Sequence, residues 1–223
     1  TGTWETVTTF DVGADLGFFK DKLTFSADFY IRNTKGILAV GKQLPSIYGA
    51  GEPKVNANDM RTTGWEIQFE WRDSFNIGSE RLDYSIGGSL ADYTAVYTKA
   101  DNPDGIIGSP YVGMRLGEIW GYRAGGLFAS DEEAAQYISE IDCSKIYTEY
   151  MNCTSEYGKG VRGGDLKILD VDGDGELTWG NNTIYNHGDA EIIGNSQPRF
   201  SYGFNAGFNI HGFDFSIFFQ GIG

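Results

Sequence analysis

The sequence predicts an all-β protein built from antiparallel strands, and three observations lead to this fold class. The 223 residues include 32 Gly, 15 Phe and 13 Tyr but only 5 Pro and 3 Met, a balance typical of strands and turns rather than helices. Six segments alternate apolar with polar or small residues at a period of two. The connections between these segments are alternately short and long.

Each alternating segment has one apolar face, as expected of a strand between two different environments. The first two alternate Phe, Leu, Val and Ala with Asp, Gly, Ser and Thr, and the third alternates Trp, Ile and Phe with charged residues and Gln. The fourth sets Leu, Tyr and Ile against Asp, Ser and Gly, and the last two are rich in Phe. The predicted strands are Phe10–Phe18, Leu23–Ile31, Trp65–Arg72, Leu82–Leu90, Phe200–Ile210 and Phe213–Gln220.

The lengths of the connections indicate a transmembrane β-barrel. Short connections follow the first, third and fifth strands, and long ones follow the second and fourth; they are Phe19–Lys22, Asn76–Arg81 and His211–Gly212, and Asn33–Thr63 and Tyr97–Pro198. Outer-membrane barrels have short periplasmic turns and long extracellular loops, with apolar residues facing lipid and polar residues facing a wet lumen. Alternation alone also suits a soluble antiparallel sheet with one solvated face, so that alternative stays open.

Charge and composition exclude several classes of function. With 17 basic and 31 acidic residues the net charge is −14, and we expect no nucleic-acid partner, because phosphate binding depends on Lys and Arg. No apolar run approaches the ~20 residues of a membrane-spanning helix. Neither His187 nor His211 lies near a Ser or Cys motif, so the sequence offers no catalytic constellation and we expect neither histidine to be catalytic.

The two cysteines, Cys143 and Cys153, are ten residues apart without a CxxC spacing. A disulfide in an oxidising compartment and two free thiols are both compatible with this spacing, whereas a zinc site would need further ligands.

The long segment from Tyr97 to Gln197 carries 17 acidic and 7 basic residues. Ser130, followed three residues later by Glu133, predicts the capping box of a short helix. Asp170, Asp172, Asp174 and Glu176 occupy positions 1, 3, 5 and 7 of an EF-hand-like loop, with Gly173 and Gly175 between them.

This pattern predicts a calcium site in the 170–181 loop, with carboxylates from the aspartates and a backbone carbonyl from Glu176. Position 12 is Asn181 instead of a bidentate Glu, so we expect weak affinity, on the order of 10⁻⁴ to 10⁻³ M, with Asp165, Asp189, Glu191 or water completing the shell. A tight Asp/Gly turn without a metal, or a magnesium site, are the alternatives.

Aromatic residues form two groups. Phe18, Phe19, Trp71 and Phe213 lie beside the short connections, where an interfacial aromatic belt is expected. A second group lies in the long connections and is expected to pack the loops or to stack on sugar rings; it comprises Tyr48, Trp120, Tyr122, Tyr147, Tyr150, Tyr157 and Trp179.

Five motifs in one order resemble SusC/RagA-type TonB-dependent transporters of the Gram-negative outer membrane. They are Thr3–Val7, Asn56–Glu66, Gly117–Tyr122, Ile192–Gly203, and Gly212–Asp214 with Phe219–Gly221. The resemblance spans nearly the whole chain. It implies that residues 1–223 form about six strands of a larger plugged barrel, with a large extracellular loop at about 97–197 and the plug outside this chain.

The same resemblance implies a function. The family imports oligosaccharides or peptides into the periplasm, with a SusD-like lipoprotein lid, energy from the TonB complex, and outer-membrane lipid around the barrel. The family is not enzymatic, so the resemblance implies no enzymatic activity and no organic cofactor. Two other functions remain as alternatives: a soluble β-sandwich that binds carbohydrate, and a surface adhesion or structural barrel protein.

Overall fold

The computed structural model describes residues 2–40, 49, 53–146 and 161–223. Within them the chain forms two compact units. Unit 1 comprises residues 1–101, 112–116 and 197–223, and unit 2 comprises residues 102–111 and 117–196. Each unit is described by itself.

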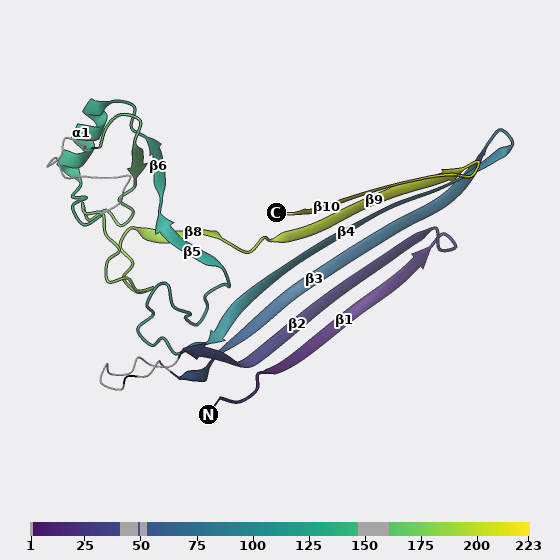
Figure 1. Ribbon diagram of the computed structural model, residues 1–223. Helices are drawn as coiled ribbons and strands as arrows, with labels where there is room; N and C mark the ends of the chain where they lie inside the picture. The colour runs from purple at the N-terminus through teal and green to yellow at the C-terminus, as the bar shows by residue number, and fades with distance from the viewer. Residues whose placement is uncertain (1, 41–48, 50–52, 147–160) are drawn as a thin grey trace. The chain divides into compact units, whose positions relative to one another are not determined.

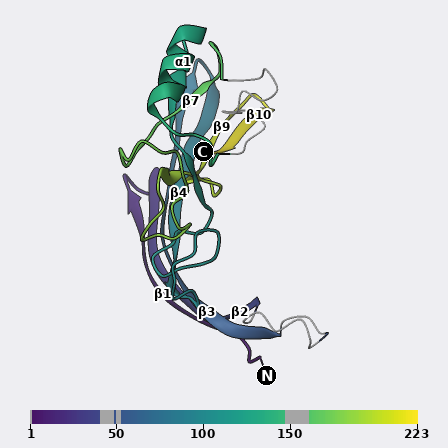
Figure 2. The same cartoon turned by 90° about the vertical axis from the view of Figure 1, so that its left-hand side faces the viewer.

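Unit 1 is a six-stranded antiparallel sheet (Figure 1). Its order is β1-β2-β3-β4-β9-β10, so each strand pairs with the next one in this unit and unit 2 is inserted between β4 and β9. In the view of Figure 2 the strands are bent rather than straight. The strands are β1 Thr6–Phe18, β2 Leu23–Val40, β3 Lys54–Ile77, β4 Glu80–Lys99, β9 Phe200–Ile210 and β10 Phe213–Ile222.

All six predicted strands are present, but the predicted connection Asn33–Thr63 is wrong in extent. β2 continues to Val40 and β3 begins at Lys54. This region is rich in Asn, Thr and Lys, so the apolar alternation fades while backbone pairing continues. A register shift between Thr34 and Ile37 interrupts the pairing locally, and Gly36 there has a φ of 73°, which glycine adopts without strain.

The turns between paired strands follow their residue types. His211 and Gly212 both have positive φ, as a two-residue type I′ hairpin requires. Gly78, with a φ of 66°, stands first in the two-residue turn between β3 and β4. We call the end of the sheet with these turns the turn end, and the opposite end the loop end.

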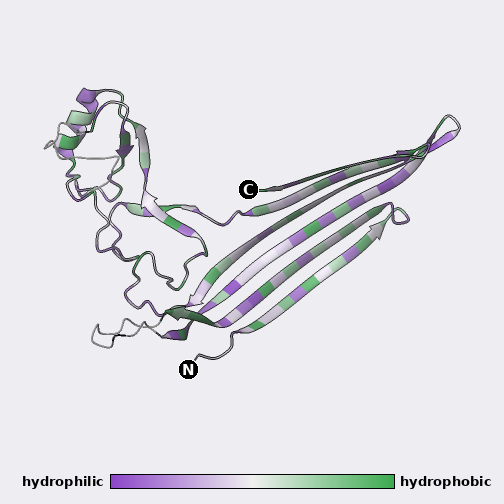
Figure 3. Cartoon of the chain, viewed as in Figure 1, coloured by the Kyte–Doolittle hydropathy of each residue, from purple (hydrophilic) through white to green (hydrophobic). Residues whose placement is uncertain are grey.

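The strand register joins the six apolar faces into one surface, which we call the apolar face. One row runs across the whole sheet through residues paired in sequence: Leu16, Phe25, Phe69, Gly88, Phe204 and Phe219. Figure 3 shows the resulting alternation of hydrophobic and hydrophilic residues along the strands. If the register between two neighbouring strands shifted by one residue, all the apolar side chains of one strand would move to the other face of the sheet.

The apolar face is exposed rather than packed. Phe10 is 61% exposed, Phe69 44% and Phe219 58%. Ala95 is the one buried hydrophobic residue of unit 1 among the described residues. Such a surface is unfavourable in water, because burying a large apolar side chain fully contributes about 1.5–3 kcal/mol of free energy that an exposed one does not gain. An open sheet with this face is what a segment of a transmembrane barrel presents, whereas the apolar face of a soluble β-sandwich packs against a second sheet.

Unit 2 has a small hydrophobic core of its own. Two short antiparallel pairs, β5 Glu118–Tyr122 with β8 Ala190–Asn195 and β6 Ala124–Leu127 with β7 Leu166–Ile168, accompany helix α1 Asp131–Glu140. The core cluster consists of Phe128, Ala134, Cys143, Ile146, Val161, Ile168 and Leu177. The sequence predicted a long loop here, and it missed these strands because each has only three to six residues.

The predicted helix is confirmed. Ser130 is its N-cap and accepts a hydrogen bond from the Glu133 amide. The Glu133 carboxylate in turn accepts one from the amide of Ala129, one residue before the cap, at 2.7 Å. These hydrogen bonds satisfy amides that the first turn leaves without helical partners.

Candidate functional site

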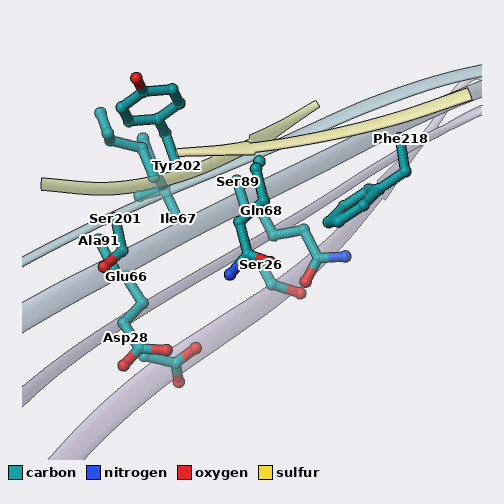
Figure 4. A pocket seen from close by; sticks show the side chains of 13 residues that line it. Ser26, Asp28, Glu66, Ile67, Gln68, Ser89, Ala91, Ser201, Tyr202 and Phe218 are labelled. Atoms are coloured by element: carbon teal, nitrogen blue, oxygen red, sulfur yellow. The ribbon is translucent and has the colours of Figure 1, made fainter. Parts of the chain in front are cut away.

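The polar face of the sheet is the first candidate site, because barrel lumens present polar groups to a passing ligand. Its central row pairs Asp28 with Glu66, Glu66 with Ala91 and Ala91 with Ser201. In Figure 4 the Asp28 and Glu66 carboxylates lie together below the strands, whereas Tyr202 extends to the opposite side. A hollow of about 220 Å³ is lined by this row and the next one along the strands.

Hydrogen-bonding side chains line part of that hollow, together with apolar ones; the hydrogen-bonding side chains include Ser26, Asp28, Glu66, Gln68, Ser89 and Gln220. Ser26 Oγ donates to Asp15 Oδ1 at 2.5 Å, and Gln68 and Ser89 pair in the same row. These carboxylates, hydroxyls and amides can bind polar ligands. They form no nucleophile–base arrangement of the kind that catalysis requires.

Charged groups gather at the turn end, around a wider hollow of about 680 Å³. Arg72 contacts Glu70 at 2.6 Å and Arg81 contacts Asp83 at 2.8 Å. Each pair joins residues two apart on one strand, so both charges point to the same side of the sheet. The polar face therefore combines paired charges at the turn end with hydroxyls and carboxylates in the middle.

The predicted aromatic residues lie at the turn end, as expected. The rings of Phe19 and Trp71 are 6.0 Å apart, and Trp71 Nε1 donates to the Tyr84 hydroxyl at 3.2 Å. Phe208 lies 6.3 Å from Phe213. Sequence reasoning did not single out Tyr84 and Phe208, although they belong to the same alternating pattern.

The acidic loop of unit 2 is the second candidate site. One carboxylate oxygen from each of Asp170, Asp172 and Asp174 lies within 4.8 Å of the others. Internal hydrogen bonds shape the loop: Asp170 accepts from the amides of Gly173 at 2.7 Å and Gly175 at 3.0 Å. The three aspartate carboxylates that the sequence predicts as metal ligands therefore lie close together in the folded loop.

The carboxylates of this loop lie close enough together to affect one another's charge. The Asp174 amide donates to Asp172 and favours its charged form, but desolvation and the charges of Asp174, Asp189 and Asp170 together raise the pKa of Asp172. Oxygen donors of this kind suit a hard divalent cation. Calcium binding stays a prediction.

Glu176 has a second role that the sequence did not indicate. Its side chain forms an ion pair with Lys145, and this hydrogen bond raises the pKa of Lys145. Its backbone lies in a parallel bridge with Asp142. The Glu176 carboxylate is therefore engaged with Lys145. The atom of Glu176 that the sequence predicts as a metal ligand is its backbone carbonyl oxygen, which this ion pair does not use.

The three acids considered as additional ligands all have other partners. Asp165 accepts from the Arg162 amide at 2.9 Å, and Glu191 pairs with Arg123 at 2.7 Å. Asp189 is fully buried and accepts from the amides of Val171 and Thr178. Asp189 thus fixes both ends of the acidic loop, a role for which no local sequence pattern exists.

The loop aromatics within the described residues pack against one another. The rings of Tyr122 and Trp179 meet edge to face at 5.5 Å, and Trp120 lies 5.5 Å from His187. Burial raises the pKa of Tyr122 to about 12, with a further contribution from the charge of Asp189. These contacts agree with the packing interpretation. The other four predicted members, Tyr48, Tyr147, Tyr150 and Tyr157, lie outside the described residues.

Cys143 is buried in the core of unit 2 and is disulfide-bonded. Cys153 lies outside the described residues. A bonded Cys143 agrees with the disulfide alternative.

No helix among the described residues is both long and apolar enough to cross a membrane.

The chain is similar to several curated proteins. TonB-dependent receptor P39 from Formosa agariphila is 27% identical over 236 residues, which cover 97% of this chain and 22% of that protein. TonB-dependent receptor P3 from the same organism is 24% identical over 242 residues, covering 97% of this chain and 20% of that protein. The chain therefore spans about a fifth of the length of these relatives.

Solved structures share the fold. The RagAB peptide transporter matches 97% of this chain and 21% of its own chain, with a TM-score of 0.57 and 15% identity. The RagAB peptide importer in its open-open state matches 99% of this chain and 20% of its own, with a TM-score of 0.61 and 16% identity.

A family model described as TonB dependent receptor-like, beta-barrel, matches residues 2–222. This is a receptor family rather than an enzyme family. The match covers both units, and the open sheet with its exposed apolar face is what a part of such a barrel presents. The resemblance drawn from the five sequence motifs is confirmed: the chain belongs to the TonB-dependent receptor-like β-barrel family.

Proposed function

We propose that this chain is part of the barrel wall of an outer-membrane, TonB-dependent importer that passes oligosaccharides or peptides into the periplasm. The observation that carries the proposal is the separation of the sheet's faces. Its apolar face is exposed across all six strands, and the opposite face carries carboxylates, hydroxyls and amides. This arrangement suits lipid on one side and a hydrated passage on the other.

The partners follow from the same proposal. Energy enters through the TonB complex, which acts on parts of the receptor outside this chain. A SusD-like lipoprotein covers the extracellular mouth, beside the long segment at about 97–197. One structural relative is the RagAB peptide importer, which supports peptides as one class of cargo. The polar lining contains acceptors and donors for either peptides or sugars.

Uptake by cells tests the proposal. A strain that lacks the full-length receptor gene should lose uptake of a labelled oligopeptide or oligosaccharide mixture, and the intact gene should restore it. A variant in which the energy-coupling segment of the receptor is deleted should assemble normally but remain inactive. Normal uptake by the strain without the gene would overturn the proposal.

A surface adhesion or structural barrel is the alternative function. It predicts loss of cell attachment without loss of uptake when the gene is removed. Attachment of the same two strains to a coated surface, measured beside uptake, separates the two functions.

A further inference from the structure

β4 changes its partner towards the loop end of the sheet. It pairs with β9 as far as Asp92 and Phe200, where β9 begins, but β4 itself continues to Lys99 (Figure 1). Beyond Asp92 its neighbour is the segment 112–116, which we call the strap. The strap belongs to unit 1, although the residues on both sides of it belong to unit 2. The chain of unit 2 is therefore attached to the sheet through the strap as well as at its two ends.

Backbone hydrogen bonds hold the strap on β4. The Tyr97 amide donates to the Met114 carbonyl at 3.0 Å, and the Tyr97 carbonyl accepts from the Gly113 amide at 2.9 Å. The Leu116 amide donates to the Ala95 carbonyl at 2.8 Å, and Ala95 is only 5% exposed. The strap thus occupies the edge of β4 that β9 occupies nearer the turn end.

A longer β9 would compete for this edge. In the register of β4 and β9, Asp92 pairs with Phe200. Continuing this register by three residues would place Gln197 opposite Ala95, a residue that the strap already pairs with. The strap and a longer β9 therefore exclude each other, and the point where β9 begins decides which segment pairs with this part of β4.

Arg199 lies at that point. Phe200 points to the apolar face, and the alternation of a strand would turn Arg199 to the polar face. Instead the chain bends at Arg199. Its Nη2 lies 2.8 Å from Asp92 Oδ2, and its guanidinium lies 5.0 Å from the centre of the Phe200 ring. Both contacts are on the apolar face, so they are incompatible with a strand that continues through Arg199.

Asp92 depends on the contact with Arg199. The Asp92 side chain is 8% exposed, and its Oδ1 is buried without a hydrogen-bond partner in the described part of the chain. Moving the guanidinium to the other face would leave a buried carboxylate unpaired, which costs free energy. This cost favours the bend at Arg199 over a longer β9.

We infer that the Asp92–Arg199 ion pair is a positioning contact that ends β9 and keeps the loop-end edge of β4 for the strap. While the pair is intact, the chain bends at Arg199 and the strap pairs with β4. Without the pair, Arg199 can turn to the polar face, residues 197–199 can pair with β4, and the strap is displaced. The pair thereby controls how the long insertion is attached to the sheet, a role that does not depend on the proposed function.

Hydrogen exchange of the purified full-length receptor, measured without cargo, tests the inference. Arg199→Gln should accelerate exchange about tenfold or more in peptides that contain the strap amides of Gly113 and Leu116. Losing a hydrogen bond to a charged group changes an opening equilibrium by at least this factor. Peptides from β1 and β2 should exchange at the parent rate. Arg199→Lys keeps the cation beside Asp92 and should preserve most of the protection.

The matched control is Arg81→Gln. Arg81 is likewise 68% exposed and lies 2.8 Å from a carboxylate, that of Asp83, but it is at the turn end, so its loss should leave exchange in the strap unchanged. The double variant Asp92→Leu/Arg199→Gln removes the buried charge together with its partner. It should still accelerate exchange in the strap, because the contact that bends the chain is lost.

Heat-dependent gel migration reports barrel assembly. If Arg199→Gln does not assemble, Asp92→Asn replaces it, because it weakens the same contact without leaving an unpaired charge, and a smaller acceleration is expected. Unchanged exchange of the strap in an assembled variant would overturn the inference, as would an equal acceleration in Arg81→Gln. Parent-like protection in the double variant would also overturn it, since the unpaired charge alone would then explain the effect of Arg199→Gln.

Discussion

Asp189 accepts a 2.8 Å hydrogen bond from the amide of Thr178, and its second carboxylate oxygen accepts one of 2.7 Å from Val171. The side chain is fully buried. The two amides flank the acidic loop, so a single carboxylate holds the entry and the exit of the loop together. Backbone donors at this distance satisfy a buried carboxylate without a cation partner.

This contact leads to the first prediction. Asp189→Asn keeps the shape but replaces one acceptor with an NH₂ group that faces an amide donor. The mismatch should destabilise this part of unit 2 by about 1–3 kcal/mol. Hydrogen exchange of the full-length receptor, read on peptides containing Val171 and Thr178, should become faster. Asp104→Asn changes an exposed acid of the same unit and should leave those peptides unchanged; equal effects would contradict the role of Asp189.

The second prediction concerns the apolar face. Phe69→Arg should destabilise the assembled barrel by roughly 2–4 kcal/mol if the side chain lies near the bilayer midplane. Gln68→Arg, one residue earlier, should have little effect because it points to the polar face. Urea-dependent unfolding in lipid vesicles measures both. Equal losses at the two positions would show that the alternation does not separate lipid from water.

The third prediction concerns orientation. Protease added to intact cells should cut between Val40 and Lys54 and within residues 97–197, because the proposed orientation puts these connections outside the cell. The turn at Phe19–Lys22 and the turn near Gly78 should be spared. Permeabilising the outer membrane should then make Lys20 and Lys22 accessible to trypsin. Cleavage at these turns before permeabilisation would reverse the orientation.

The sequence was sufficient for the pattern of the sheet. Phe69 and Gln68 could be assigned to opposite faces because a strand has a period of two and one face is uniformly apolar. The same reasoning failed between Asn33 and Thr63. There the end of β2 changes from the polar Asn33–Lys35 to the continuously apolar Ile37–Val40, and the start of β3 is largely polar. Strand pairing therefore continues without a period-two alternation in the sequence.

The candidate sites were only partly predictable. Asp170, Asp172 and Asp174 could be grouped because the signal is local and the glycines permit the turn. Asp189 could not be assigned its role, since it lies 11 residues from Thr178 and its partners are backbone amides of no particular residue type.

The last prediction is that the acidic loop binds calcium. Its three aspartate side chains already converge within 4.8 Å, and a cation at their centre would relieve the charge repulsion that, together with desolvation, raises the pKa of Asp172. Calcium bound to oxygens at about 2.3–2.6 Å should draw the loop together. Limited proteolysis of the full-length receptor should therefore show slower cleavage at residues 170–176 with millimolar calcium than with chelator.

Asp172→Asn should abolish this difference, because it removes one of the three converging carboxylates, while Asp104→Asn should preserve it. Magnesium in place of calcium should protect less, since it favours fewer protein ligands and retains its water. If the intact receptor is cleaved at the same rate with calcium and with chelator, the segment is a turn held by its internal hydrogen bonds, such as that from the Gly173 amide to Asp170.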